Sequence, residues 1–272
     1  MRFPLRQSLL TAVAAATLLA PLQSAHVAAQ TAAVECSKDW VGREAELEAA
    51  MKTNKIAKLE TVPIGVTKPE RAILDPPTPV PRFVWKQLTP GYKNGYFESY
   101  KAEIAAYLLD RMLDLHMVPP FVERTINGKT GAAGYWINNT KNWDAKYPPQ
   151  GPEPKWSYQI TRMKMLDLLI ANIDRNQGNL LYDADWHLFL IDHSRAFIGK
   201  KDLKNMAPLG RADRPLWEKM QALTFESLKE GLGEWVGDND LKAMIIRRDL
   251  MAAEIKKLVD KRGENFIFFT ER

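Results

Sequence analysis

Cysteine is almost absent from this sequence. Cys36 is the only cysteine in 272 residues, so the chain cannot form an internal disulfide bond. Glu35 stands directly before Cys36 and disfavours a lipoprotein signal. We interpret Cys36 as incidental, with a disulfide between two copies as the alternative. The fold must therefore depend on its hydrophobic core and not on covalent cross-links.

Several familiar enzyme motifs are also missing. The sequence contains no G-x-S-x-G nucleophile motif and no G-x-G-x-x-G loop. Gly128-Lys129-Thr130 looks like the end of a P-loop, but Glu123 stands where that motif needs a glycine. The histidines His116, His187 and His193 do not have the spacing of a metal cluster, so a zinc site is not expected.

A strong excess of one charge sign is missing as well. Lys and Arg number 38 against 33 Asp and Glu, which gives a net charge of +5. Because the two signs are interleaved along the chain, we expect no nucleic-acid partner. The apolar fraction of 46% can form a substantial core, and the length allows one large domain or two small ones.

Residues 1–29 have the pattern of a secretory signal peptide. Arg2 and Arg6 form a basic start, residues 9–20 are apolar but too short to favour a spanning helix, and residues 27–29 fit a cleavage site. No later stretch could span a bilayer. We predict a periplasmic or secreted protein without stable membrane insertion after signal cleavage; an uncleaved anchor is the alternative. The Ala-rich signal favours a bacterial source.

The stretch 163–193 carries the strongest functional signal. Leu166, Leu169, Ile170 and Ile173 repeat at helical spacing and predict a buried helix that runs toward Asp174. A short polar loop follows, in which Gly178 can take a positive φ. Apolar residues then predict two strands, Leu180–Tyr182 and His187–Ile191.

Three oxygen-bearing side chains, Asp174, Asn179 and Asp192, are thereby placed at the ends of rigid elements. This set suits phosphoryl transfer: Asp174 would orient or deprotonate an attacking hydroxyl, while Asn179 and Asp192 would hold Mg²⁺ or Mn²⁺ against the phosphates. The structural alternative is a helix end, a glycine cap and a hairpin with solvated polar residues.

The pattern of the first half of the chain predicts a small β-rich lobe. We expect a helix within residues 38–53, two strands around a turn at residues 65–69, and an extended proline-rich linker at residues 75–81. Gly65, Thr67 and Lys68 could contact phosphates, although an ordinary hairpin turn explains this segment equally well.

Alternation predicts a strand at Arg82–Leu88 that carries Lys86, and helical spacing predicts an amphipathic helix at Tyr100–Leu115. In the phosphoryl-transfer arrangement a strand lysine pairs with a glutamate on the following helix, so Glu103, in the first turn of that helix, is the expected partner of Lys86, and Glu98 is the competing partner. A buried pair of this kind suits an orienting role better than a stabilising one. The structural alternative is a solvent-facing Lys86 and a Glu103 that only favours the helix N-terminus.

Asn127-Gly128 predicts a hairpin between strands Phe121–Ile126 and Ala132–Ile137. Trp136 and Ile137 would form a hinge whose backbone binds adenine, with the Trp136 side chain in the core. Residues 138–154 read as a surface loop. From Phe197 the chain is expected to pass almost directly into helices. Those helices are placed at Arg214–Leu223, Glu226–Glu230 and Asp238–Arg262.

The segments Ile173–Leu181 and Leu190–Phe197 resemble the D-R-x-x-x-N-x-L and I-D-x-x-x-A-F signatures of the phosphatidylinositol 3-/4-kinase-like group and the secreted Golgi casein-kinase-type family. Asp174 and Asn179 also have the offset of the protein-kinase loop H-R-D-x-x-x-x-N. However, Asn172-Ile173 replaces His-Arg, and Asp192-His193-Ser194 replaces D-F-G. Arg175 and Arg195 flank the two acids and are expected to be structural partners of carboxylates, with phosphate contact as the alternative.

The resemblance implies an α+β, two-lobed protein-kinase-like fold, with a helix and small lobe at residues 30–137 and a helical large lobe at residues 138–272. It implies an exported ATP-dependent phosphotransferase in which Lys86, oriented by Glu103, binds the α- and β-phosphates. The acceptor would be a hydroxyl of a protein, a sugar or a lipid head group. The alternatives are a nucleotide-binding pseudokinase and an enzyme that transfers AMP.

Overall fold

The computed structural model describes residues 38–62 and 69–271, and these described residues belong to one compact unit. The predicted signal peptide at residues 1–29 lies outside the described residues. So do Gly65, Thr67 and Lys68, the proposed phosphate-contacting turn. Within the described ranges, no helix is both long and apolar enough to span a membrane.

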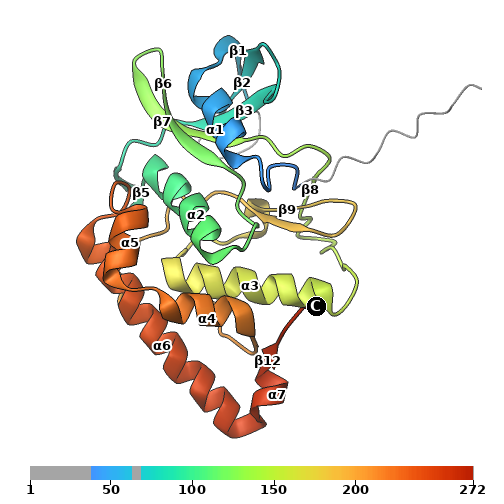
Figure 1. Ribbon diagram of the computed structural model, residues 1–272, viewed down its shortest axis with the longest axis vertical. Helices are drawn as coiled ribbons and strands as arrows, with labels where there is room; N and C mark the ends of the chain where they lie inside the picture. Colours follow the sequence, from blue (N-terminus) through green and yellow to red (C-terminus); the bar gives the residue numbers. More distant parts are fainter. Residues whose placement is uncertain (1–37, 63–68, 272) are drawn as a thin grey trace, which may run out of the picture. The chain divides into compact units, whose positions relative to one another are not determined.

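A five-stranded antiparallel sheet forms the upper part of the unit (Figure 1). Its strand order is β1-β2-β3-β7-β6, and the register joins β3 and β7 through the pairs Phe83↔Tyr135 and Lys86↔Ala132. The strands are β1 (Lys55–Thr61), β2 (Glu70–Asp75), β3 (Arg82–Lys86), β6 (Phe121–Ile126) and β7 (Lys129–Tyr135).

The two faces of β3 serve different purposes. Side chains alternate across a strand, so Phe83 and Trp85 point to one face and Lys86 to the other. Phe83 and Trp85 are buried in a cluster with helix α1 (Glu44–Thr53). Lys86 faces helix α2 (Tyr100–Leu113) and pairs with a glutamate there. The strand therefore anchors the sheet with one face and presents a charged group with the other.

Helix α2 is fixed at both ends. The Ser99 side chain accepts a hydrogen bond from the Lys101 backbone N–H and caps the N-terminus. Near the C-terminus, the carboxylate of Asp110 accepts hydrogen bonds from the backbone N–H groups of Met117 and Val118, at 2.8 and 2.9 Å. These bonds hold the chain as it leaves the helix for β6.

Asp110 gives the fold an expected pH dependence. Burial raises the pKa of Asp110 from 3.8 to about 6, and the two backbone hydrogen bonds only partly oppose it. Between roughly pH 4 and 6 the folded state holds a proton that the unfolded state has lost, so the free energy of unfolding should fall by about 1.4 kcal/mol per pH unit as the pH rises. Denaturant unfolding of the wild type and Asp110→Asn at several pH values checks this. The difference in free energy of unfolding between the two proteins should change with pH by that slope. A difference that stays constant with pH would contradict the prediction.

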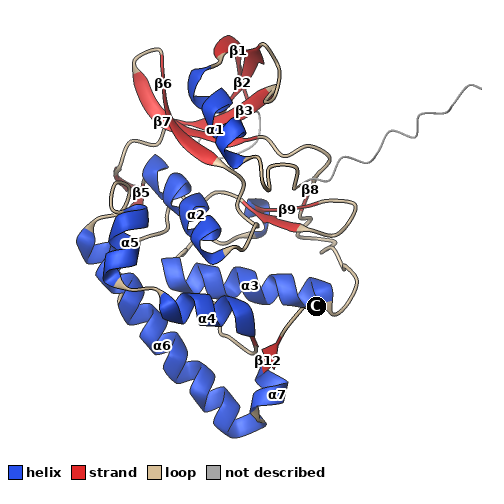
Figure 2. Cartoon of the chain, viewed as in Figure 1, coloured by secondary structure: helices blue, strands red, loops and turns tan. Residues whose placement is uncertain are grey.

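The lower part of the unit is helical (Figure 2). Its helices are α3 (Lys155–Ile170), α4 (Arg214–Ala222), α5 (Phe225–Leu232), α6 (Asp238–Arg262) and α7 (Glu264–Ile267). The remaining short strands are β4 (Gly91–Lys93), β5 (Tyr96–Glu98), β8 (Lys141–Asn142), β9 (Leu180–Tyr182), β10 (Leu188–Leu190), β11 (Ala212–Asp213) and β12 (Phe268–Phe269). The expected α+β arrangement, with strands mainly first and helices mainly second, is confirmed.

The end of α3 differs from the prediction. The helix stops at Ile170, and Ala171 takes a left-handed conformation with φ of 51°. Ile173 is therefore outside the helix and 42% exposed, whereas Leu166 and Leu169 are buried as expected. Gly178 lies in a short 3₁₀ turn at Gln177–Asn179 and does not have a positive φ, so that expectation was wrong.

The segment after Phe197 also differs from the prediction. The next helix, α4, begins only at Arg214, so residues 198–211 form an irregular segment. Arg247 of α6 is fully buried and holds the start of this segment by donating to the carbonyls of Ile198 and Lys200. The same guanidinium donates to the carbonyl of Leu169 at 2.9 Å. One side chain thus ties α3, α6 and the irregular segment together.

Candidate active site

Lys86 of β3 meets two carboxylates at the junction of the sheet and the helical half. Its Nζ lies 2.7 Å from Oε1 of Glu103 and 3.1 Å from Oδ1 of Asp192. The Lys86 and Glu103 side chains are 9% and 0% exposed, and the Asp192 side chain is 29% exposed. The expected pairing of Lys86 with Glu103 is present in the structure, and Asp192 joins it from the other half of the chain.

Lys86 and Glu103 hold each other in their charged forms, and the Asp192 carboxylate adds to the attraction on Lys86. Burial alone would lower the pKa of Lys86, but the charges of Asp192 and Glu103 outweigh it and leave that pKa raised. Burial alone would raise the pKa of Glu103, but attraction to Lys86 and the hydrogen bond from the His193 backbone N–H leave that pKa well below its ordinary range. Lys86 is thereby kept as a cation, the form that binds phosphate.

Glu103 also binds the segment that carries Asp192. Its Oε2 accepts a hydrogen bond from the His193 backbone N–H at 3.0 Å. The His193 ring is fully buried, and burial lowers its pKa. Arg175 can only donate, and its guanidinium lies 2.8 Å from His193 Nε2, so Nε2 accepts and Nδ1 carries the proton. That Nδ1–H lies 3.7 Å from Glu103 Oε2.

Arg175 joins the loop that follows α3 to the end of β10. Its guanidinium donates to the carbonyls of Asn179 and Ile191, at 3.0 and 2.8 Å. It also forms an ion pair with Asp167 of α3, at 3.0 Å. These contacts agree with the structural role that the sequence favoured. Arg175 therefore fixes the spacing between the two chain segments that carry Asn179 and Asp192.

The loop from Asp174 to Asn179 is closed by its own side chains. Asn176 accepts a hydrogen bond from the Gly178 backbone N–H and caps the 3₁₀ turn. Asn179 Nδ2 donates to the Asp174 carbonyl at 2.9 Å, which orients the amide. Within the described ranges, no hydrogen bond reaches Asn179 Oδ1. That oxygen and the partly exposed Asp192 carboxylate are hard ligands that fit Mg²⁺ or Mn²⁺.

Asp174 is held by a residue of the Asp192 segment. Arg195 donates to Asp174 Oδ2 at 3.1 Å and to Glu98 Oε1 at 2.6 and 2.9 Å. Glu98 is thus occupied by Arg195 and is not the partner of Lys86. This excludes the competing pairing of Lys86 with Glu98 that the sequence left open.

The expected hinge has a different side-chain environment from the predicted one. Ile137 is buried, but Trp136 is only half-buried and stands outside the hydrophobic clusters. The guanidinium groups of Arg71 and Arg82 lie 5.4 and 5.5 Å from its ring centroid. The prediction that the Trp136 side chain packs in the core is wrong, because cation–π contacts hold it at the sheet surface. The expected adenine contacts of Trp136 and Ile137 stay predictions.

The structure thus joins Lys86 to Glu103 and Asp192 by ion pairs, and it joins Asn179 to Asp174 by a hydrogen bond. The sequence analysis missed that His193 contacts Glu103 through its backbone N–H and Arg175 through its ring. It also missed the hairpin β4–β5 that carries Glu98. A signal for that hairpin was present, because Asn94-Gly95 is the preferred dipeptide of a two-residue hairpin turn. No local pattern indicates the His193 contacts.

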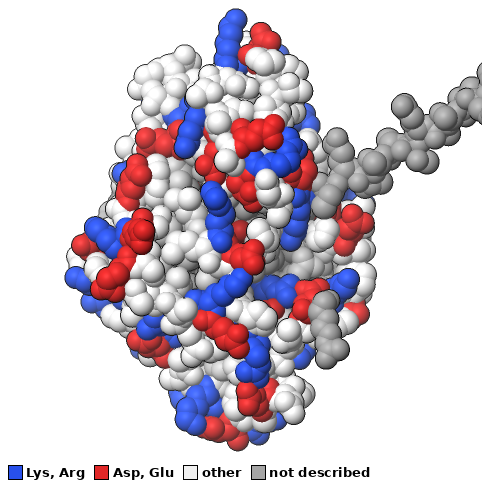
Figure 3. Space-filling model, viewed as in Figure 1, with Lys and Arg blue, Asp and Glu red and all other residues white. Residues whose placement is uncertain are grey.

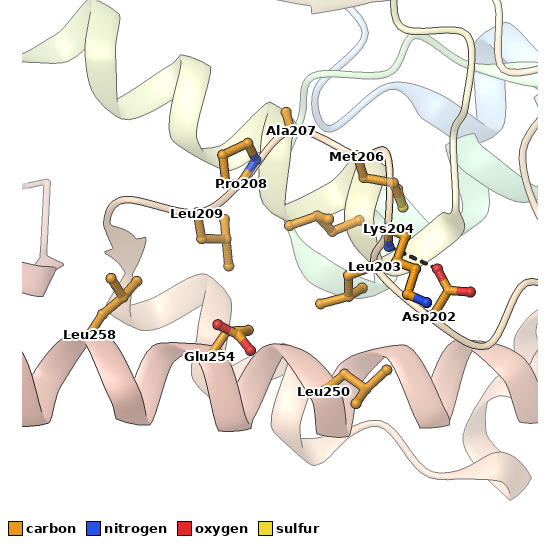
Figure 4. A pocket seen from close by; sticks show the side chains of 11 residues that line it. Asp202, Leu203, Lys204, Met206, Ala207, Pro208, Leu209, Leu250, Glu254 and Leu258 are labelled. Carbon is orange, nitrogen blue, oxygen red and sulfur yellow. Dashed lines mark hydrogen bonds between the residues drawn. The ribbon is translucent and has the colours of Figure 1, made fainter.

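Other features lie away from this cluster. An apolar cavity of about 410 Å³ lies between the irregular segment and α6, where Leu203, Leu209 and Leu250 line it (Figure 4). Asp183, Asp185 and His187 lie close enough to hold a cation, but Asp183 already bonds the His187 ring at 2.7 Å. The face drawn in Figure 3 intersperses both charge signs, as the sequence indicated.

No family model matches the chain, and no curated protein matches it. Several solved structures match the chain. A structure of hydra Fam20 with sugar matches with a TM-score of 0.67 and 17% identity, over 85% of this chain and 93% of that chain. A Golgi casein kinase structure matches with a TM-score of 0.64 and 16% identity, over 83% of this chain and 79% of that chain.

The Golgi casein kinase with Mn/ADP bound matches similarly, with a TM-score of 0.64, 15% identity, and coverage of 84% of this chain and 79% of that chain. At such identities the likeness shows the fold alone. The expected place beside the phosphatidylinositol 3-/4-kinase-like group and the bacterial origin stay predictions. The chain has a two-lobed kinase-like fold of the kind seen in Fam20 and Golgi casein kinase structures.

Proposed function

We propose that the protein is a metal- and ATP-dependent phosphotransferase that moves the γ-phosphate of ATP to a hydroxyl group. The observation that carries this proposal is the buried contact of Lys86 with both Glu103 and Asp192. A lysine paired with a helix glutamate and placed beside a metal-binding aspartate is the arrangement on which kinases depend. The neighbour with Mn/ADP bound supports a nucleotide and a divalent cation.

The residues divide the reaction among them. Lys86 binds the α- and β-phosphates, and Glu103 keeps it oriented. The acceptor oxygen bonds to the γ-phosphorus while the bond from that phosphorus to the β–γ bridging oxygen breaks, and ADP leaves. Asp174 orients the acceptor hydroxyl and takes its proton. Its carboxylate is 37% exposed, so an acceptor can reach it.

A divalent cation fits the two oxygen ligands at the other side of the site. Asn179 Oδ1 and Asp192 would hold it, and when bound it would neutralise charge on the transferring phosphoryl group. Lys86 already neutralises part of the Asp192 charge at 3.1 Å. We therefore expect nucleotide and metal to bind together, because the nucleotide phosphates would give Lys86 a further anionic partner beside Glu103 and Asp192.

The signal-peptide pattern at residues 1–29 supports a periplasmic or secreted location. The proposed acceptor is a hydroxyl group of a protein, a sugar or a lipid head group. The hydra Fam20 structure described with sugar and the Golgi casein kinase structures are consistent with hydroxyl acceptors.

The test compares ATP labelled at the γ-phosphate with ATP labelled at the α-phosphate, in the presence of Mg²⁺ or Mn²⁺ and candidate acceptors. Transfer of the γ-label alone would support the proposal. Transfer of the α-label would identify an AMP-transferring enzyme instead. Nucleotide binding without transfer of either label would identify a pseudokinase.

A further inference from the structure

Asp174 occupies a loop, and its backbone is better fixed than its carboxylate. The Asp174 carbonyl accepts hydrogen bonds from the Asn176 backbone N–H at 2.7 Å and from Asn179 Nδ2 at 2.9 Å. Its Oδ1 has only a 3.5 Å contact from Asn176, in the same loop. Within the described ranges, the one ion pair to its carboxylate is made by Arg195, to Oδ2 at 3.1 Å.

Arg195 is rigidly connected to Asp192, the predicted metal ligand. Arg195 lies in the tight turn that directly follows Asp192, in which the Ala196 backbone N–H donates to the His193 carbonyl at 2.9 Å. The Ser194 side chain donates to Asp192 Oδ1 at 3.2 Å. The Ser194 carbonyl in turn accepts from the Ser99 backbone N–H at 2.9 Å. Arg195 can therefore set the position of the Asp174 carboxylate relative to Asp192.

The hairpin β4–β5 holds the Arg195 guanidinium from the opposite side. Tyr96 and Glu98 are two residues apart on β5 and so share one face of the strand. The guanidinium carbon lies 4.5 Å from the Tyr96 ring centroid, and Glu98 accepts two hydrogen bonds from the same group. The Glu98 side chain is 8% exposed, so this pair is sheltered from solvent. The turn Asn94-Gly95, with φ of 49° and 83°, closes the hairpin.

We propose that Arg195 is a positioning residue for the transfer step. Held by Glu98 and Tyr96, it fixes Asp174 through Oδ2 and leaves Oδ1 for the acceptor hydroxyl. A planar guanidinium directs its donors in a rigid fork and so fixes the directions of two carboxylates, whereas the donors of a lysine ammonium rotate on a flexible stem. The inference rests on the proposed function but assigns a role to residues that take no part in binding nucleotide or metal.

The test measures kcat, the KM for ATP and nucleotide-dependent thermal stabilisation in variants of the full chain. Arg195→Gln should lower kcat by about 10- to 100-fold, because a misplaced catalytic group costs that much. The KM for ATP and the thermal stabilisation should stay within about twofold of the wild type, because Arg195 contacts neither Lys86 nor Asn179 in the structure. Arg195→Lys should recover only part of the loss.

Two variants in the hairpin sharpen the test. Tyr96→Leu removes the stacking contact with Arg195 and should lower kcat in the same sense as Arg195→Gln. Tyr92→Leu is the matched control: Tyr92 is 81% exposed and packs on Phe97, its cross-strand partner, so kcat should stay unchanged. Equal losses in the two tyrosine variants would indicate a general effect of the hairpin and would overturn the positioning role.

Other results would also overturn the inference. If Arg195→Gln raised the KM for ATP and left kcat unchanged, Arg195 would be a phosphate contact. If kcat stayed within twofold of the wild type, Arg195 would have no part in transfer. Failure of the proposed function is distinguishable, since the wild type itself would then transfer no phosphate.

Discussion

Replacing Asp174 with asparagine is expected to lower the rate of phosphate transfer by roughly 10²- to 10⁴-fold, the usual contribution of a general base. Asparagine keeps the size of the side chain but cannot take a proton from the acceptor. Binding of nucleotide should survive, because Asp174 forms no bond with Lys86 or Asp192 in the structure. The measurement is label transfer from γ-labelled ATP, together with the thermal shift that nucleotide produces.

Asp260→Asn is the matched control for Asp174→Asn. Asp260 lies on the exposed side of α6, and among the residues that the structure describes its ion pair is with Lys256, one helical turn away, so its loss should change neither transfer nor stability measurably. An Asp174→Asn variant that transfers phosphate as fast as the wild type would remove Asp174 from the reaction. A variant that loses nucleotide stabilisation would show that Asp174 acts in binding.

Replacing Glu103 with alanine is expected to destabilise the fold by about 3–5 kcal/mol, the usual cost of breaking a buried ion pair. Glu103 is fully buried, and its loss leaves the Lys86 ammonium without its closest partner and the His193 backbone N–H without its acceptor. Nucleotide affinity should fall as well, because Lys86 is no longer oriented. Denaturant unfolding and a nucleotide titration measure the two effects.

Two further variants separate stability from binding. Lys86→Met combined with Glu103→Gln removes both charges while keeping an acceptor for His193, so most of the lost stability should return but nucleotide affinity should not. Glu230→Ala, on the exposed surface of α5, is the control for loss of a glutamate. If Glu103→Ala had the same free energy of unfolding as Glu230→Ala, the buried Lys86–Glu103 pair would not stabilise the fold, which would contradict the prediction.

The Lys86–Glu103 pair was predicted from local patterns together with the kinase arrangement, in which a strand lysine pairs with a glutamate of the following helix. Strand alternation places Lys86 opposite the face that buries Phe83 and Trp85, and helical spacing places Glu103 beside the apolar side of α2. Both elements are strongly periodic and only the short β4–β5 hairpin separates them in the chain, so the side of each element that carries the charge could be predicted from the sequence. The same reasoning placed β3, α2 and α6 within two residues of their observed limits, whereas the strand expected at Ala132–Ile137 is observed at Lys129–Tyr135.

The rest of the site depends on contacts that no local pattern encodes. Arg195 and Glu98 are 97 residues apart, and His193 and Glu103 are 90 residues apart. The candidate partners of each charged side chain were too numerous to choose between without the packing of the two halves. The prediction that the helix α3 includes Ile173 was wrong for a related reason. The apolar spacing continues to Ile173, but Ala171 takes a left-handed conformation and ends the helix before it.

The most direct test of the central claim is a calorimetric titration of the purified chain with ATP in the presence of Mg²⁺, and then of Mn²⁺, for the wild type and Asp192→Ala. The geometry of Lys86, Asn179 and Asp192 predicts that the wild type binds the nucleotide with metal and that Asp192→Ala, correctly folded, loses this metal-dependent binding. Absence of binding by folded wild-type protein with either metal would contradict the claim and leave only a kinase-like scaffold.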